Sequence, residues 1–237
     1  MKTYMVGEPC INWAAFWSFI QDEKIEMDPA SVFNAGSAGE TLPEIGGRLC
    51  YMSFGKGRKT NKEYIDNIIN QKHFSVLEHA NWSFIITGVS RSLTHELVRH
   101  RHFSFSQLSQ RYVDESEVDF ILPSPLTIDE NVKAAVTDTF YMTRKIYSLA
   151  ASFLEDSYKD LPATERRKAA RQAARAVLPN ATETKIMVTG NARAWREFIE
   201  KRNSQFADPE IRELARHILA KLHKSSPNLF ADLLEAK

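Results

Sequence analysis

The stretch Arg99-His-Arg-His-Phe-Ser-Phe-Ser-Gln-Leu-Ser-Gln-Arg-Tyr112 gathers three arginines, two histidines, three serines and two glutamines in one short segment. Arginine forms paired hydrogen bonds with phosphate, and serine and glutamine side chains can read the polar edges of a base or flavin. Phe103, Phe105 and Tyr112 add apolar walls. The segment therefore predicts a site for an anion joined to a flat heterocycle.

A solvated, charged surface is the competing interpretation of this segment. Its arginines would then pair with Glu78, Glu96 or Asp114, and such exposed pairs contribute little to stability. Against this, serines, glutamines and aromatic residues alternate with the arginines, and acidic residues are lacking inside the segment. Because convergent polar groups mark binding sites, we favour a ligand site.

A metal site is not expected in this region. His95, Glu96, His100 and His102 lack the His-Glu-x-x-His spacing, and the neighbouring arginines would repel a cation. Known nucleotide motifs are also missing, since the chain has no Gly-x-Gly-x-x-Gly and residues 55–60 lack the spacing of a Walker loop.

The elements before the segment can be predicted from apolar spacing. Residues 81–89 alternate as a buried strand, and a helix capped by Ser90 or Ser92 should follow and end at the segment. Further upstream, we expect a loop over 35–47, a helix around 49–51, a second loop over 54–60 and a helix near 61–71. Thr60 and Glu63 have the spacing of a capping box for this last helix.

The elements after the segment are mainly helical. Asp129 should cap a long scaffold helix, and Thr164 should cap another that runs to Arg175 before Pro179. Residues 184–189 alternate as a second strand that ends at Gly190-Asn191, and a helix carrying Trp195 follows. Asp208 and Pro209 indicate the start of a final helix.

Composition limits the class of protein. The 237 residues carry 31 Lys plus Arg against 30 Asp plus Glu, so the net charge of +1 argues against a general nucleic-acid binder. Two cysteines, Cys10 and Cys50, suit a reducing compartment. The first residues lack the pattern of a secretion signal, and no later stretch has the length and apolarity of a membrane span. We expect a cytoplasmic protein, without membrane association, whose residues 1–237 form one domain.

Four separated motifs resemble those of the flavin-dependent thymidylate synthases. The first is Arg99-His100-Arg101, followed after seven residues by Ser109 and then by Arg111-Tyr112. The others, in the family's order, are His73-Phe-Ser75 with Glu78-His79, then Arg175-Ala-Val-Leu-Pro179, and Asn191-Ala-Arg193 followed by Arg202. The resemblance extends from about residue 46 to 215, most of the chain.

The resemblance implies a fold and a reaction. The fold would be α+β, with a central, mostly antiparallel sheet flanked by long helices, in a homotetramer whose sites are shared between subunits. The activity would be the reductive methylation of dUMP to dTMP. FAD would be the cofactor, methylenetetrahydrofolate the one-carbon donor and NADPH the reductant.

The resemblance also assigns site residues by motif position. The flavin would be contacted by Ser75, Arg99, His100, Arg101, Gln107, Asn191, Arg193 and, less typically, Glu197. The nucleotide dUMP would be held by Glu96, Leu97, Val98, Arg99, Gln107, Leu108, Ser109, Gln110, Arg111, Arg175 and Arg202.

Individual roles follow from the chemistry of these side chains. Arg111 and Arg175 suit the phosphate of dUMP. Arg202 would lie over the uracil as the catalytic cation, favouring ionisation at N3, and its competing interpretation is a salt bridge with Glu200 or Asp208. Ser109 has no His-Asp pair at a recognisable spacing to activate it, so we assign it to binding.

Two positions depart from common family forms. Ser106-Gln107 stands where many members have Asn-Glu, and a neutral glutamine cannot act as a base. Glu197 stands where Asn or His is frequent, and an ionised carboxylate only accepts hydrogen bonds.

Two rival functions remain open. An RNA-binding module would use residues 99–112 as a basic and aromatic surface, and would carry no chromophore. A flavoprotein of the same fold that had lost dUMP methylation would be yellow but would form no dTMP. The presence of both Arg175 and Arg202 speaks against this second rival.

Overall fold

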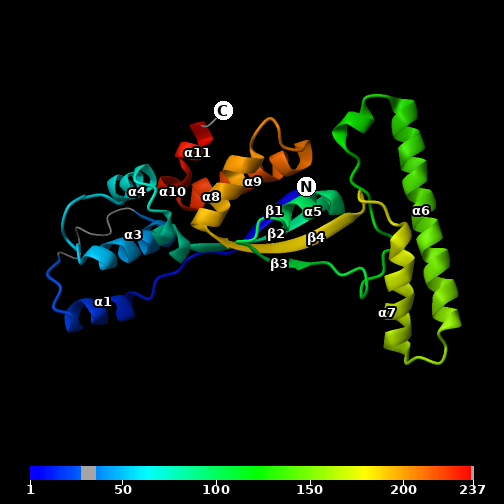
Figure 1. Ribbon diagram of the computed structural model, residues 1–237, viewed down its shortest axis with the longest axis horizontal. Coiled ribbons are helices and arrows are strands. Elements are labelled where there is room, and N and C mark those ends of the chain that lie inside the picture. The colour runs from blue at the N-terminus through cyan, green and yellow to red at the C-terminus, as the bar shows by residue number, and fades with distance from the viewer. Residues whose placement is uncertain (28–35, 236–237) are drawn as a thin grey trace. The chain divides into compact units, whose positions relative to one another are not determined.

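The computed structural model describes residues 1–27 and 36–235, and its sheet has four strands in the order β1-β2-β4-β3 (Figure 1). The strands are β1 (Lys2–Gly7), β2 (Asn81–Ser90), β3 (Ser104–Gln107) and β4 (Glu183–Asn191). The hydroxyls of Ser83 and Thr189 lie 2.8 Å apart, and the Gly88 N–H donates to the Glu183 carboxylate at 3.1 Å. As residue numbers increase along β2, those of the facing residues on β4 decrease, so the two strands are antiparallel. The predicted α+β class is confirmed.

The chain divides into two compact units, each built from separate stretches. Unit 1 contains residues 1–2, 86–99 and 106–187, and unit 2 contains residues 3–85, 100–105 and 188–237. Every strand of the sheet contributes residues to both units.

The first half of unit 2 is helical before β2. It contains α1 (Trp13–Asp22), α3 (Ala38–Tyr51), α4 (Asn61–Asn70) and the 3₁₀ helix η1 (Phe74–His79). The capping box of Thr60 and Glu63 is present at the start of α4, as predicted. The loop over 54–60 is also confirmed.

The expected loop over 35–47 is wrong for residues 38–47, which belong to α3, while Ala35 lies outside the described residues. Ser37 and Glu40 form a capping box that starts this helix. Its glycines allow close packing rather than a turn. A Cβ added at Gly47 would lie 2.4 Å from the Tyr64 hydroxyl, and one at Gly39 would lie 2.5 Å from the Trp82 ring.

The second half of unit 2 packs helices on the sheet. It contains α8 (Ala192–Arg202), α9 (Pro209–Ser225), α10 (Pro227–Phe230) and α11 (Asp232–Glu235). Asp208 accepts from the Glu210 N–H at 2.9 Å, so the predicted start of α9 is confirmed. Trp195 of α8 meets Phe84 of β2 edge-to-face with ring centroids 5.1 Å apart, and both are fully buried.

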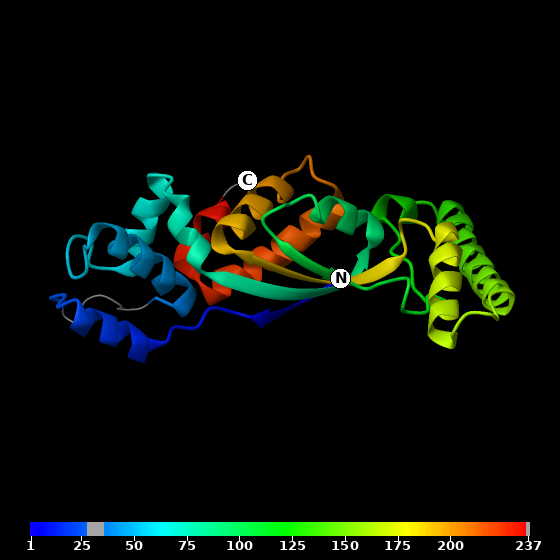
Figure 2. The same ribbon diagram turned by 60° about the horizontal axis from the view of Figure 1, so that its bottom comes forward.

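Unit 1 is dominated by two long helices. It contains α5 (Arg91–Leu97), η2 (Ser124–Thr127), α6 (Glu130–Ser157), α7 (Ala163–Ala174) and η3 (Arg175–Val177). Helices α6 and α7 run side by side (Figure 2). Asp129 caps α6 and Ser90 caps α5, both as predicted. The cap predicted at Thr164 is wrong, because α7 already begins at Ala163 after Pro162.

Among the described residues, no helix combines the length and the apolar composition needed to cross a bilayer.

Candidate functional site

The predicted site residues are distributed over both units. Unit 1 holds most of the positions assigned to dUMP, namely Glu96, Leu97, Val98, Arg99, Gln107, Leu108, Ser109, Gln110, Arg111 and Arg175. Unit 2 holds Arg202 and most of the positions assigned to the flavin, namely Ser75, His100, Arg101, Asn191, Arg193 and Glu197.

In unit 2, the start of α8 brings three predicted flavin residues onto one helix. The Asn191 side chain accepts from the Ala194 N–H at 2.9 Å and thereby caps the helix. Arg193 follows within the first turn and donates to Glu78 of η1 at 2.7 Å. Both partners of this ion pair are about half exposed, so a stronger anion can displace the Glu78 carboxylate at small cost.

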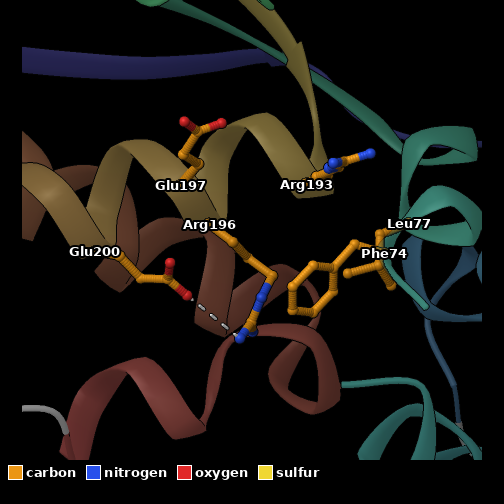
Figure 3. A pocket seen from close by; sticks show the side chains of 6 residues that line it. All are labelled: Phe74, Leu77, Arg193, Arg196, Glu197 and Glu200. Atoms are coloured by element: carbon orange, nitrogen blue, oxygen red, sulfur yellow. Dashed lines mark ion pairs between the residues drawn. The ribbon is translucent and has the colours of Figure 1, made fainter. Parts of the chain in front are cut away.

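Arg193 borders two cavities of unit 2. One, of about 260 Å³, also contains Glu197, Arg196 and Phe74, and Glu200 lies 3.8 Å from Arg196 (Figure 3). The Arg196 guanidinium is held by Asp232, to which it donates at 2.8 and 2.6 Å. The other, of about 400 Å³, contains Ser75 and His73. A cation, a hydroxyl and an aromatic ring along these walls suit a dinucleotide that carries both phosphates and flat rings.

Glu197 is ionised in this setting. The hydrogen bond from Lys201 lowers the pKa of the Glu197 carboxyl, and burial opposes this effect. Glu197 can therefore accept but not donate a hydrogen bond at neutral pH.

At the end of α8, Arg202 meets His100. The Arg202 Nε donates to His100 Nε2 at 3.1 Å. Burial and the nearby Arg202 and Lys201 lower the pKa of His100 to about 4, against the opposing effect of Glu197. The imidazole is therefore neutral at physiological pH and acts as an acceptor at Nε2.

In unit 1, Gln107 is fixed by two threonines that the sequence analysis did not select. Its Nε2 donates to Thr94 Oγ1 at 3.1 Å and to Thr184 Oγ1 at 3.3 Å. The Thr94 hydroxyl donates its only proton to the Arg91 carbonyl at 2.8 Å, so its oxygen can only accept a hydrogen bond from the residue at position 107. A glutamate at position 107 could not donate that hydrogen bond when ionised, which gives a physical reason for glutamine here.

The segment from Gln110 to Glu115 contains buried polar atoms that still need partners. Within the described residues, Gln110 Nε2, Arg111 Nε and both carboxylate oxygens of Glu115 have no hydrogen-bond partner. Gln110 is 6% exposed and Glu115 is 2% exposed. Because buried polar groups are normally satisfied, this segment is prepared for a polar ligand or another polypeptide.

Arg91 and Glu115 are further members of this region that sequence reasoning missed. Burial lowers the pKa of the Arg91 guanidinium, Glu115 raises it, and the nearby Arg175 lowers it again. Two guanidinium groups close enough to repel each other favour an anion between them. Arg91 and Arg175 lie 84 positions apart in the chain, so only the fold reveals that they are close.

The remaining predicted positions differ in accessibility. Leu97 is fully buried, so it can reach a ligand only through its backbone. Ser75, Val98, Arg99 and Arg101 are exposed, whereas Glu96 is half-buried. The Leu108 N–H donates to the Lys185 carbonyl at 2.9 Å, and the Ser109 hydroxyl accepts from the Arg111 N–H at 3.4 Å.

Four of the acidic residues in the competing interpretations, Glu78, Asp114, Glu200 and Asp208, each contact another group. Glu78 pairs with Arg193 and Asp114 with Arg171, rather than serving only the cluster at 99–112. Glu200 lies 3.8 Å from Arg196, and Asp208 caps α9. These contacts weaken the view that the arginines exist to neutralise these carboxylates.

Comparison with known proteins decides the family. Residues 33–228 match the family model described as thymidylate synthase complementing protein. Flavin-dependent thymidylate synthases of Mycobacterium tuberculosis (strain H37Rv) and Mycobacterium avium (strain 104) are each 52% identical over 198 residues, covering 82% of this chain and 79% of the relative. The chain belongs to the flavin-dependent thymidylate synthase family.

A solved member of the family has the same fold. The structure of thymidylate synthase X from Helicobacter pylori with FAD and dUMP matches with a TM-score of 0.67 and 22% sequence identity, covering 99% of both chains. The resemblance inferred from the four motifs is therefore confirmed at the level of family and fold.

Proposed function

We propose that this chain catalyses the reductive methylation of dUMP to dTMP as one catalytic domain of residues 1–237. The observation that carries the proposal is the 52% identity to flavin-dependent thymidylate synthases over 82% of the chain, together with the arginine-rich motifs of both units. In the overall reaction, methylenetetrahydrofolate gives its one-carbon unit to C5 of the uracil and NADPH supplies the reducing electrons.

We propose that unit 2 holds the cofactor FAD through Ser75, His100, Arg101, Asn191, Arg193 and Glu197, with Arg99 and Gln107 as further contacts. Arg193 would exchange Glu78 for the diphosphate, because a phosphate accepts paired, charge-assisted hydrogen bonds. When bound and reduced by NADPH, FAD supplies the hydride that completes the methyl group.

The proposed dUMP site draws on the groups that still need partners in unit 1. Arg111 and Arg175 would bind the phosphate, and a dianion there would also relieve the repulsion between Arg175 and Arg91. Gln110 would donate from its buried Nε2. Backbone and side-chain groups of Glu96 to Arg99 and of Gln107 to Ser109 would complete the contacts.

Arg202 is the proposed catalytic residue. A guanidinium near the uracil stabilises negative charge that develops when N3 loses its proton, and this raises electron density at C5. The chain thus contributes charge and orientation, while the cofactor contributes the redox chemistry.

The exposed face of α6 supports the proposed homotetramer. Met142, Ile146, Leu149 and Phe153 recur at intervals of four and three residues, so they share one side of the helix. They are 56%, 43%, 72% and 68% exposed, respectively. A contiguous apolar stripe of this kind is typical of an interface, and we propose that a second copy of the chain covers it.

Size-exclusion chromatography with light scattering tests the assembly. Leu149→Glu with Phe153→Glu should shift the protein from four subunits to fewer, because two charges would be buried in an apolar contact. The control is Lys224→Glu at an exposed position of α9, which should remain tetrameric. A monomeric wild-type protein would refute the tetramer.

Spectroscopy tests the reaction. The purified protein should show a flavin spectrum that NADPH bleaches without oxygen, and dUMP with methylenetetrahydrofolate should restore the colour and yield dTMP. A yellow protein that forms no dTMP would support the rival flavoprotein. A colourless protein that FAD does not activate, and that binds RNA in a salt-sensitive manner, would support the RNA-binding rival.

The free, exposed cysteines Cys10 and Cys50 fit the proposed cytoplasmic location.

A further inference from the structure

His100 has a contact that the proposed flavin role does not use. Its Nε2 accepts the hydrogen bond from Arg202 Nε at 3.1 Å, although the two residues lie 102 positions apart in the chain. An imidazole nitrogen accepts a hydrogen bond only when it carries no proton. The ring in this contact is therefore the tautomer with its proton on Nδ1.

The charges around the ring maintain this state. Arg202 and Lys201 from α8 both disfavour a protonated imidazole, and partial burial adds to their effect, while Glu197 opposes them. A protonated His100 would place two cations in direct contact and would break the bond to Arg202. The pair is thus compatible only with a cationic arginine and a neutral histidine.

The imidazole is also held in place by the core of unit 2. Its ring meets Phe198 edge-to-face at 5.2 Å and Phe103 at 6.2 Å, and these phenylalanines are 0% and 7% exposed. The Phe103 N–H donates to the His100 carbonyl at 3.2 Å, which closes the local turn. The Phe103 ring packs in turn on Trp195 at 4.4 Å. The acceptor therefore sits on a rigid support.

Arginine side chains have several rotatable bonds, so their direction is costly to fix. A bond at Nε fixes the guanidinium plane, and with it the directions in which Nη1 and Nη2 donate. We propose that His100 is a positioning residue whose Nε2 holds Arg202 Nε and thereby aims the Arg202 guanidinium at the uracil of dUMP. The inference rests on the proposed function, and it concerns dUMP rather than the flavin contact.

The test compares two substitutions at His100. In His100→Gln, the amide oxygen lies near the position of Nε2 and can still accept from Arg202. His100→Leu keeps similar volume but has no acceptor. His217→Gln is the control, because His217 lies on α9 with its side chain 44% exposed and 3.9 Å from Glu213.

Affinity for dUMP is measured by calorimetry on the oxidised, FAD-loaded proteins, so that no turnover is needed. A hydrogen bond to a charged group contributes about 1.5–3 kcal/mol, which corresponds to a loss of about 10- to 100-fold in His100→Leu. His100→Gln should recover all but about threefold of this loss, and kcat should follow the same order. FAD content is measured in parallel, and the control should match the wild type.

Three results would overturn the inference. These are wild-type affinity in His100→Leu, equal losses in the leucine and glutamine variants, or ¹⁵N NMR of the wild-type protein that shows a proton on His100 Nε2. If His100→Leu does not fold or does not bind FAD, His100→Asn replaces it, since its shorter side chain withdraws the acceptor from Arg202. A wild-type protein that forms no dTMP would instead reject the proposed function, and the NMR tautomer would still decide whether the contact exists.

Discussion

The surroundings of Arg202 in unit 2 and the segment Gln110–Glu115 in unit 1 prepare polar groups in opposite ways. Arg202 is bonded to His100, and that ring rests on the aromatic core of its own unit. In unit 1, Gln110, Arg111 and Glu115 have buried side-chain atoms for which the described residues provide no hydrogen-bond partner. The first region is organised by the chain itself, whereas the second needs a ligand or another subunit to satisfy it.

The largest expected effect, on the rate of dTMP formation, comes from removing the Arg202 side chain. Arg202→Ala should retain flavin but lower dTMP formation by about 100- to 1,000-fold, as removal of a single charge-stabilising donor typically does. Steady-state rates and the flavin spectrum provide the measurement. Arg216→Ala, which removes an exposed contact with Asn203, is the control. Activity near that of the wild type would contradict the catalytic role and favour the interpretation of Arg202 as a structural salt-bridge partner.

Binding of dUMP should stabilise mainly the segment Gln110–Glu115, whose buried polar atoms need hydrogen-bond partners. At 100 times its dissociation constant, dUMP should increase the free energy of unfolding by about 2.7 kcal/mol. Hydrogen exchange should slow more over residues 107–115 than over residues 191–201, because only the first stretch gains partners for its buried atoms. Equal protection of both stretches would contradict the comparison.

A smaller effect on the free energy of unfolding is expected where Tyr147 of unit 1 contacts the segment Gln110–Glu115. The fully buried Tyr147 of α6 accepts the Glu115 N–H through its hydroxyl at 3.2 Å. Tyr147→Phe would leave that N–H without its partner and should cost about 1–2 kcal/mol in chemical denaturation. Tyr141→Phe, at an exposed position on the same helix, should cost nothing measurable. An unchanged midpoint in Tyr147→Phe would show that the segment does not depend on this contact.

A last effect, no larger than the preceding one, is a pH dependence of stability from His100. The unfolded histidine gains a proton below its ordinary pKa of 6.5, whereas the folded one does so only near 4. Between these values the unfolded state binds more protons, so stability falls as pH is lowered from 7 to 5. His100→Gln should therefore lose less melting temperature than the wild type over this interval. A parallel decline in both proteins would remove His100 as a cause.

Much of the secondary structure was predictable because its signals are local. The Thr60–Glu63 capping box, the Asp129 and Asp208 caps and the alternation in β2 each depend on residues a few positions apart. The end of α3 was predicted around 49–51, but its residues 38–47 were missed because glycine disfavours helices in general. Here Gly39 and Gly47 make room for Trp82 and Tyr64. That reason lies in tertiary packing, which the local pattern does not contain.

The sequence suggests members of the candidate site, but it does not show the contacts among them. Motif resemblance selected His100, Gln107 and Arg202 together with the remaining predicted positions. It could not reveal that Thr94 and Thr184 hold Gln107, or that His100 holds Arg202, because these partners are brought together only by folding. The predicted contacts with FAD and dUMP remain predictions.

The division of every strand between the two units has a consequence for how the protein can be cut or rearranged. The chain passes from one unit to the other at positions 2–3, 85–86, 99–100, 105–106 and 187–188, and four of these five crossings lie inside a β-strand. No single truncation can therefore release either unit with all its segments. Limited proteolysis should not liberate an intact half, and gene fusion could not transfer one half as a module. The cofactor and nucleotide residues are thus inherited together.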